Sequence, residues 1–257
     1  METLFEADVF AEAPGDIAVD GERVYWAGGL AGVGYGVQSV PKGGGAITQV
    51  TLAFDAVGAL TIDADHVYFV SSCGASACVQ RVPKGGGDVT TIAADQSDVV
   101  GLAVDVTHVY WASYPGYGLI YRAPKIGGGP VEQLSGLQEQ PRSIAIDEQA
   151  VYVASVKDSV TVHVVKVPLT GAAEPTVLAT GVHGSPGGIA VDGSYVYWAA
   201  ATALSGPSAV FALSKAGGMP FDITGPQLSP LALTMDADAV YYSNNGWQGD
   251  IRRAPKP

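Results

Sequence analysis

An aspartate recurs six times along the chain at a nearly constant interval, and this repeat constrains the fold more than any other feature. The six residues stand 43, 42, 42, 45 and 44 residues apart, and each is followed four and five residues later by Val and Tyr. A period of about 40 to 50 residues is typical of propellers and solenoids, in which each repeat is one supersecondary unit. The repeated aspartates are Asp20, Asp63, Asp105, Asp147, Asp192 and Asp236.

Each repeat carries the signals of four β-strands. A short apolar segment with a small middle residue, such as IAV, precedes the aspartate, and small side chains suit the crowded innermost strand of a propeller blade. The β-branched and aromatic segment that follows, such as VYWAS, is typical of a strand buried on both faces. The third segment ends in Val-Pro-Lys or a variant before Gly-Gly, which indicates a strand end and a tight turn. The fourth segment is looser, as in DVTTIAA.

We therefore predict a single all-β domain, residues 1–257, folded as a six-bladed β-propeller with four antiparallel strands per blade. The sixth repeat stops at IRRAPKP, after its third strand, and residues 2–7 (ETLFEA) have the pattern of the missing fourth strand. The 21 residues after Asp236 and the 20 that end at Asp20 add up to one further repeat length. We expect the N-terminal strand to complete the last blade and close the ring, because this pairs two open edges.

The pattern LAVD…VYWAS…GLIYRAPK…GGG resembles the YWTD repeats of low-density-lipoprotein-receptor-type propellers and, more loosely, NHL repeats. It is most similar to uncharacterised bacterial TolB-like six-bladed propellers with VYW and VPK-GG repeats. The chain departs from the YWTD pattern in lacking its final Thr-Asp. The resemblance implies a six-bladed fold and carries no catalytic residues over to this chain.

Composition narrows the choice of partners. A net charge of −12 repels phosphate backbones, so we expect no nucleic-acid partner. No run of about 18 apolar residues occurs, which predicts that no helix spans a membrane. The N-terminal METLFEADVF lacks the pattern of an export signal. We expect a monomer.

The two cysteines indicate the compartment. Cys73 and Cys78 stand in the short segment CGASAC, whose ends can meet in a disulfide. A disulfide favours an extracytoplasmic location, periplasmic or secreted. The alternative is a pair of free thiols, and a metal site is disfavoured because no further Cys or nearby His is available.

Function is expected in the loops that are not repeated. The uniform turns fall on one face of the propeller, and irregular loops such as LAFDAVG, SSCGASAC and ADQSDVV fall on the other, where a rigid scaffold leaves their chemistry free to vary. The repeated aspartates are interpreted as acceptors of backbone N–H bonds in the turn that follows each of them. Exposed aromatic side chains beside glycines can stack on sugars or anchor a protein partner. The candidate binding residues in these loops are Tyr35, Tyr114, Tyr117, Asn244, Asn245 and Trp247.

A catalytic propeller is the alternative. In such enzymes a divalent metal is held at the central tunnel, and the residue four before each repeated aspartate reports on its mouth. That residue is Asp16 in the first repeat and small in the other five, which equips the tunnel poorly for a hard cation. Arg142 and His183 are the further candidates at this mouth. His163 is set aside because it lies in a predicted strand.

The sequence thus favours a noncatalytic binding module that recognises a protein or a glycan through its irregular-loop face. A hydrolase or lyase that uses Asp16, Arg142 and His183 at the tunnel mouth, with or without a metal, is the second hypothesis. No cofactor is expected, because the glycine-rich segments lack the order of a P-loop or a dinucleotide fingerprint.

Overall fold

The structure is a computed structural model that describes residues 16–30, 34–54, 56–114, 117–137, 139–158, 161–171, 174–201, 208–227, 229–244 and 250–257. The chain divides into two compact units. One unit comprises Met1–Val109 and Arg122–Glu132, and the other comprises Tyr110–Tyr121 and Gln133–Pro257. Whether the whole chain behaves as one domain stays a prediction.

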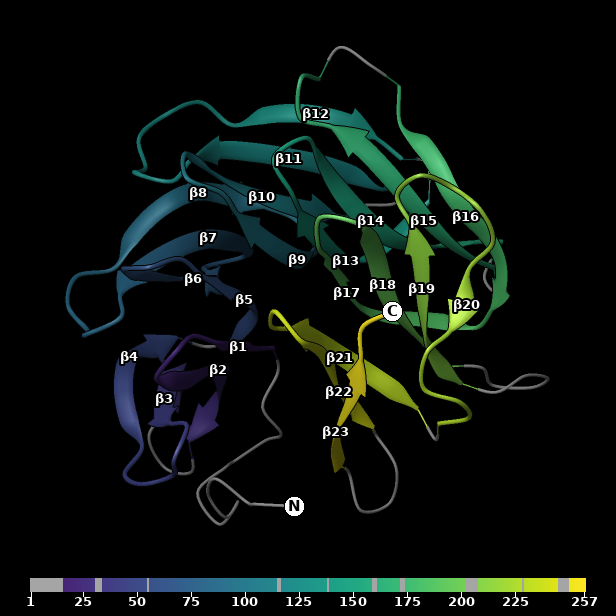
Figure 1. The fold of residues 1–257 in the computed structure, drawn as a ribbon. Helices are drawn as coiled ribbons and strands as arrows, with labels where there is room; N and C mark the ends of the chain where they lie inside the picture. The colour runs from purple at the N-terminus through teal and green to yellow at the C-terminus, as the bar shows by residue number, and fades with distance from the viewer. Residues whose placement is uncertain are drawn as a thin grey trace. The chain divides into compact units, whose positions relative to one another are not determined.

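The described residues form six antiparallel sheets that follow one another along the chain, five of four strands and one of three (Figure 1). Within each sheet, strands that are consecutive in sequence are neighbours. Each sheet corresponds to one sequence repeat, so the all-β, six-bladed propeller class predicted from the repeat is confirmed. Residues 2–7 lie outside the described residues, and closure by an N-terminal strand stays a prediction.

The first three blades contain twelve of the described strands: β1 (Ile17–Val19), β2 (Arg23–Leu30), β3 (Gly34–Pro41) and β4 (Thr48–Phe54); β5 (Val57–Ile62), β6 (His66–Cys73), β7 (Ser76–Pro83) and β8 (Thr90–Gln96); β9 (Val99–Val104), β10 (His108–Ser113), β11 (Leu119–Pro124) and β12 (Glu132–Gly136).

The last three blades contain the other described strands: β13 (Gln140–Ile146), β14 (Ala150–Lys157), β15 (Thr161–Pro168) and β16 (Thr176–His183); β17 (Ser185–Val191), β18 (Tyr195–Ala201), β19 (Ala209–Ser214) and β20 (Phe221–Asp222); β21 (Pro230–Met235), β22 (Ala239–Asn244) and β23 (Asp250–Pro255).

The strand that follows each repeated aspartate forms the core of its blade. In β14 every residue from Ala150 to Val156 is buried. Trp26, Trp111 and Trp198, which occupy the same repeat position, are exposed by 1% or less. Aromatic side chains bury the largest apolar areas of any residue, so burial on both faces, as predicted, gives each sheet its hydrophobic core.

Neighbouring innermost strands approach closely, which explains the small residues at their start. A Cβ atom added at Gly187 of β17 would lie 2.2 Å from the carbonyl oxygen of Leu231 in β21, and one at Gly188 would lie 2.5 Å from the backbone nitrogen of Leu233. Any side chain at these two positions would push the strands apart. Glycine is therefore required here by the distance between two backbones.

The repeated aspartates hold the turn between the first two strands of each blade. One carboxylate oxygen of every repeated aspartate accepts the backbone N–H groups two and three residues later, as predicted. In the first blade the other oxygen of Asp20 accepts the Tyr25 hydroxyl. It also accepts Lys84 Nζ, at 2.7 Å, from the Val-Pro-Lys segment of the next blade. The lysine contact was not predicted from the sequence.

The same contact recurs in both units. The lysine–aspartate pairs found in the described part of the chain are Lys84–Asp20, Lys125–Asp63, Lys215–Asp147 and Lys256–Asp192. Burial alone would raise the pKa of Asp20, but the Lys84 ammonium and the N–H groups of Glu22 and Arg23 outweigh burial and hold the pKa well below its ordinary value. Burial and the Asp20 charge raise the pKa of Tyr25 to about 12. The aspartate therefore stays ionised and joins adjacent blades.

Candidate functional site

The two ends of a blade differ in chemistry, as its strands show in the second blade. β6 begins at His66, beside the Asp63 turn, and ends at Cys73, in the hairpin that leads to β7. We call the end with the aspartate and Val-Pro-Lys turns the turn end, and the end with the hairpin and the interblade crossovers the loop end. In this blade the predicted functional loop SSCGASAC therefore lies at the loop end.

A disulfide joins Cys73 and Cys78 at the loop end of the second blade. Cys73 pairs with Ser76, and Cys78 pairs with Ser71, so the disulfide ties together the last residues of the β6–β7 hairpin. Gly74 forms the tip with a φ of +70°, a conformation that glycine adopts without strain. The hairpin therefore presents a covalently fixed edge to solvent.

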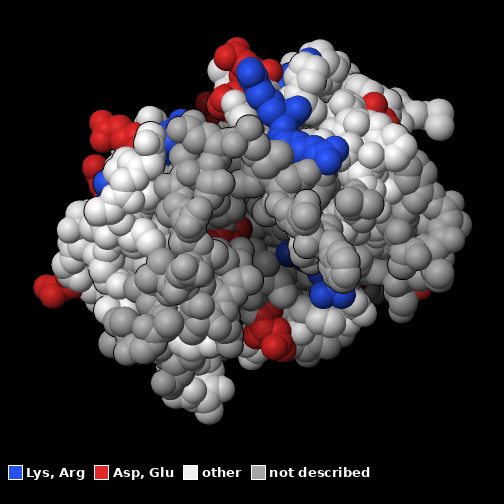
Figure 2. Space-filling model, turned by 90° about the horizontal axis from the view of Figure 1, so that it is seen from below, with Lys and Arg blue, Asp and Glu red and all other residues white. Residues whose placement is uncertain are grey.

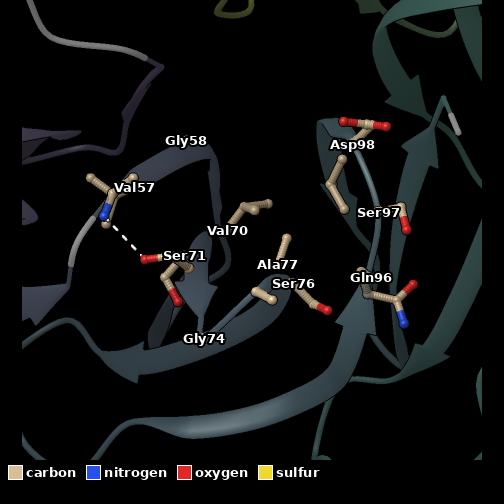
Figure 3. Close-up of a pocket in the computed structure, with 14 residues that line it drawn as sticks. Val57, Gly58, Val70, Ser71, Gly74, Ser76, Ala77, Gln96, Ser97 and Asp98 are labelled. Carbon is tan, nitrogen blue, oxygen red and sulfur yellow. Dashed lines mark hydrogen bonds between the residues drawn. The ribbon is translucent and has the colours of Figure 1, made fainter.

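An open hollow of about 610 Å³ lies beside this hairpin, within the first unit. Figure 3 shows that Gln96, Ser97 and Asp98 stand on one side of it and Val57, Ser71 and Gly74 on the other. Three sequence segments form its wall: 56–58, 70–77 and 96–99, with 73 absent from the lining. Apart from Val70, they belong to LAFDAVG, SSCGASAC and ADQSDVV, three of the loops in which the sequence predicts function.

The described part of the hollow's wall is polar and carries little charge. Four serines and Gln96 line it, and Asp98 is the one charged side chain among the lining residues that the structure describes. Ser72 Oγ accepts the backbone N–H of Ala56 at 3.2 Å, the bond drawn as a dashed line in Figure 3. Ser71 Oγ donates to Gln80 Oε1 at 2.6 Å. These bonds hold the described part of the wall in one shape.

The crossover from β8 to β9 has an unusual backbone on this side of the hollow. Asp95 and Asp98 have φ angles of +56° and +45°. Aspartate is enriched among the non-glycine residues that adopt this left-handed conformation. The two bends turn the crossover, so Gln96, Ser97 and Asp98 reach the hollow.

A second hollow, of about 680 Å³, lies at the turn end of the second unit. Lys215 Nζ lines it and binds Asp147 Oδ2 at 2.6 Å and the carbonyl oxygen of Asp192. Lys215 and Asp147 are thus engaged in joining the fourth and fifth blades. The wall of the first hollow, in contrast, is formed by loops that are not repeated from blade to blade.

Asp16, the predicted carboxylate of the tunnel mouth, lies immediately before β1 and is half-buried. Its Oδ1 accepts the N–H of Ile17 at 2.9 Å, and its Oδ2 accepts the N–H of Leu60 in β5 at 3.1 Å. Burial raises the pKa of Asp16, and these two N–H groups oppose part of the rise. The carboxylate therefore joins the innermost strands of the first two blades.

The other two residues of the predicted mouth belong to the second unit. Arg142 lies exposed in β13, and one of its guanidinium nitrogens is 3.4 Å from Gln140 Oε1. His183 ends β16, where its backbone pairs with Thr161. Its side chain lies outside the described part of the structure. A shared site of Asp16, Arg142 and His183 stays a prediction.

The aromatic residues predicted to contact a ligand differ in how far they are exposed. Tyr35 is half-buried in β3 with its ring against Gly29, where an added Cβ atom would lie 3.2 Å from Tyr35 Cε1. Tyr114 is half-buried, and Tyr117 is 58% exposed. Tyr117 is accessible for stacking, and its role stays a prediction. Asn245 and Trp247 lie outside the described residues, as does the side chain of Asn244.

A polar cluster in the fourth blade was not predicted. His163 is 6% exposed, and its Nδ1 lies 2.8 Å from Glu139 Oε1. Its Nε2 lies 2.9 Å from Thr180 Oγ1. Ser155 Oγ donates to Glu139 Oε2. A comparison of the repeats could have singled out His163. The equivalent position carries Gly36 in the first blade and Cys78 in the second, and each of these residues lies opposite the one that is equivalent to Ser155.

One face of the molecule shows few charged side chains among its described residues (Figure 2). Figure 2 shows one face, on which most of the described surface is neither acidic nor basic. Among the described residues, no group of three or more His, Cys, Asp or Glu side chains is arranged to hold a metal ion. A search of the same residues finds no helix long and apolar enough to cross a membrane.

Similar structures identify the fold. A chain of a nidogen–laminin complex matches with a TM-score of 0.65 and 20% identity, covering 82% of each chain. XC5397 from Xanthomonas campestris, described as a gluconolactonase, matches with a TM-score of 0.69 and 15% identity over 99% of this chain and 89% of its own. TolB from Acinetobacter baumannii gives 0.63 and 14%, over 91% of this chain and 64% of its own.

These identities support a shared fold and nothing finer. No protein-family model matches the sequence, and no curated protein matches it either. Binding proteins and enzymes both occur among chains of this architecture, so the function of this chain must be argued from its own residues.

Proposed function

We propose that this chain is a binding module that holds a neutral, hydroxyl-rich ligand, a carbohydrate, in the hollow at the loop end of the second blade. The observation that carries the proposal is the hollow itself, at the end of the blade where the loops are not repeated. Its volume of about 610 Å³ falls within the range of about 300–1,000 Å³ that small-molecule sites occupy.

The chemistry of the wall supports a sugar over an ionic ligand. Serine hydroxyls, the Gln96 amide and one carboxylate, Asp98, surround the space. Hydroxyls and amides both donate and accept hydrogen bonds, and a carboxylate accepts them from hydroxyl groups. The described residues of the lining include no Lys or Arg, so they offer a phosphate or carboxylate ligand no counter-charge when it is desolvated.

The shape of the wall supports a preformed site. The Cys73–Cys78 disulfide fixes the hairpin on one side, and the Ala56–Ser72 hydrogen bond fixes the preceding crossover. A rigid wall lowers the entropy lost when a ligand binds. The loop end of this blade therefore needs little rearrangement to accept a sugar.

The test is to fill the hollow. A glycan array identifies the oligosaccharide that binds best, and calorimetry then compares two variants of the second blade. Gly58→Leu places a side chain in the hollow, because an added Cβ atom there meets Val70 at an ordinary 3.9 Å. Gly85→Leu is the control, because Gly85 lies at the turn end of the same blade with nothing within 4 Å of an added Cβ atom.

We expect Gly58→Leu to abolish sugar binding and Gly85→Leu to leave it unchanged, with both variants folded. Equal affinity of the two variants for the sugar would remove the hollow from the site. If no glycan bound the unaltered protein, carbohydrate would be the wrong ligand class, and a protein partner would be sought at the loop end, where Tyr117 is exposed.

The second hypothesis, a hydrolase or lyase at the tunnel mouth, is not favoured by a described contact. Asp16 uses both carboxylate oxygens to accept backbone N–H groups. The gluconolactonase similarity is at 15% identity and supports the shared fold only. Catalysis by Asp16, Arg142 and His183 remains a hypothesis.

We further propose that the protein works outside the cytoplasm as a monomer. The support for the location is the Cys73–Cys78 disulfide, since disulfides persist mainly in oxidising compartments. Sedimentation of the purified protein tests the oligomeric state, and a second species at micromolar concentration would contradict a monomer.

A further inference from the structure

The fourth blade carries a row of polar side chains across three strands. Ser155 of β14 is paired with His163 of β15, and His163 is paired with Thr180 of β16. Residues directly opposite in antiparallel strands project from the same face of the sheet. The sheet therefore sets the three side chains in line, and Glu139, which precedes β13, reaches this line at Ser155 and His163.

A β-bulge brings Thr180 opposite His163. Val162 pairs with Val182, but the next residue, His163, pairs with Thr180, so Gly181 is the extra residue of the bulge. Its φ of +98° is readily available to glycine. Without the bulge, His163 would face a glycine that has no side chain. Bulges commonly redirect a side chain in this way.

The hydrogen bonds indicate which nitrogen of the imidazole ring carries the hydrogen. Glu139 Oε1 lies 2.8 Å from His163 Nδ1, and a carboxylate can only accept, so Nδ1 carries the hydrogen. In the neutral ring Nε2 then has the lone pair. It accepts the hydrogen of the Thr180 hydroxyl, 2.9 Å away. A nucleophile, a base and a group that orients the base thus stand in sequence.

The three residues differ in how far they are exposed to solvent. The side chains of Glu139 and His163 are 11% and 7% exposed, whereas Thr180 is exposed. The base and its orienting carboxylate are shielded from water, while the threonine lies at the surface. A purely structural network would not need its last member at the surface.

The cluster is also not repeated. The position of His163 carries Gly36 in the first blade, and the bulge there places Leu52 opposite it. The bulge is thus a property of the repeat, but the histidine and the threonine are not. The repeat by itself therefore does not account for His163 and Thr180.

We propose that Thr180 is a nucleophilic hydroxyl that takes an acyl group from an activated carboxylic ester, with His163 as its general base. Thr180 Oγ1 attacks the ester carbonyl carbon while its proton moves to His163 Nε2. The carbon–oxygen bond to the leaving alcohol then breaks, and that alcohol takes the proton from Nε2. The product is an acyl ester on Thr180, and no oxidant or cofactor is consumed.

Glu139 is a positioning residue in this step. Its carboxylate keeps the hydrogen on Nδ1 and stabilises the imidazolium that forms when His163 takes the proton. Ser155 donates to the second oxygen of Glu139 and fixes the carboxylate. This site is in the fourth blade and is separate from the carbohydrate hollow in the second, so the failure of one proposal leaves the other standing.

The test uses p-nitrophenyl acetate with the intact protein. Release of p-nitrophenolate gives the rate, and peptide mass spectrometry locates the acetyl group. We expect acetylation at Thr180, its loss in Thr180→Val and its retention in Thr180→Ser. Thr176→Val is the matched control, because Thr176 is also exposed in β16 and its strand partner is Lys166.

His163→Gln should lower the rate of Thr180 acetylation by about 100-fold or more, the usual contribution of a general base. Glu139→Gln should also lower it, and ¹⁵N NMR of His163 should show the hydrogen leaving Nδ1 for Nε2 in part of the molecules. Circular dichroism checks that each variant folds.

Acetylation spread over surface lysines with none at Thr180 would overturn the proposal. An equal rate at Thr180 in the His163→Gln variant would also overturn it, since the base would then do nothing. Should His163→Gln fail to fold, Thr180→Val and Thr180→Ser decide the question, because both replace an exposed side chain.

Discussion

Lys84 Nζ lies 2.7 Å from Asp20 Oδ2, so a lysine of the second blade completes a turn of the first. The aspartate already accepts two backbone N–H groups and the Tyr25 hydroxyl. The lysine adds a charge-assisted bond, which is the stronger kind. Because the pair joins two repeats, it contributes to the interface between blades and not only to one turn.

Lys84→Met should destabilise the protein while preserving the alkyl packing of the side chain. We expect a loss of about 1.5 kcal/mol in the free energy of unfolding, typical of a hydrogen bond to a charged group, measured by urea denaturation. Lys157→Met, at an exposed position at the end of β14, is the control. Equal midpoints for the two variants would show that the Lys84–Asp20 pair adds no stability.

Acid should weaken the folded state through the same aspartates. The pKa values of Asp20 and Asp63 are held below the ordinary value in the folded protein, because their lysines and turn N–H groups outweigh burial. An unfolded aspartate titrates near about 3.9. The stabilisation is therefore complete above that pH and is lost as the pH falls through the lower folded pKa.

The measurement is urea unfolding at a series of pH values from about 6 down to about 2, the range in which aspartates titrate. The midpoint should fall with pH, and the fall should be shallower in Lys84→Met because the folded pKa of Asp20 is then less depressed. A midpoint that stayed constant as the pH fell would contradict the lowered pKa values of these aspartates in the folded protein.

Gly187→Ala tests the close approach of the innermost strands in the second unit. The added Cβ atom would lie 2.2 Å from the carbonyl oxygen of Leu231, so β17 and β21 must separate. We expect a loss of about 2 kcal/mol, in the range of overpacked cores. Gly193→Ala, where nothing lies within 4 Å of the added atom, should be neutral or slightly stabilising. Thermal unfolding compares the two, and similar losses would argue against a steric cause.

Replacing both cysteines, Cys73→Ala with Cys78→Ala, should lower both the free energy of unfolding and the affinity for the sugar. The disulfide closes a loop with a sequence separation of 5, and chain entropy assigns so short a loop about 2 kcal/mol. The hairpin wall of the hollow would also loosen, so sugar affinity should fall. Reduction of the unaltered protein should reproduce both effects. Retained affinity after reduction would show that the hairpin is fixed without the disulfide.

The repeat predicted the blades because their signals are local. Alternation of apolar residues, the small residue of the innermost strand and the Val-Pro-Lys-Gly-Gly turn each act within a few positions. The backbone contacts of each aspartate were predictable for the same reason, since their donors are two and three residues away. The boundaries of the blades follow from the spacing of the repeat.

Contacts between blades were not predictable. The sequence shows Lys84 as part of a turn, but its partner Asp20 is 64 residues earlier. It shows Asp16 as a carboxylate, but the Leu60 N–H that occupies Oδ2 comes from the next blade. Within the fourth blade, His163 was set aside because it lies in a predicted strand, and its contact with Thr180 depends on a bulge in the strand register. A single sequence contains no direct signal for these distances.

The lysine–aspartate pairs imply an order of assembly for the blades within each described unit. In every pair the aspartate is synthesised first, and the lysine that neutralises it emerges from the ribosome with the following blade. Each of these four aspartates therefore lacks its lysine until the following blade has been made. Chains fold from the N-terminus as they are made. Assembly should therefore proceed blade by blade, with each aspartate turn completed by the lysine of the blade that follows it.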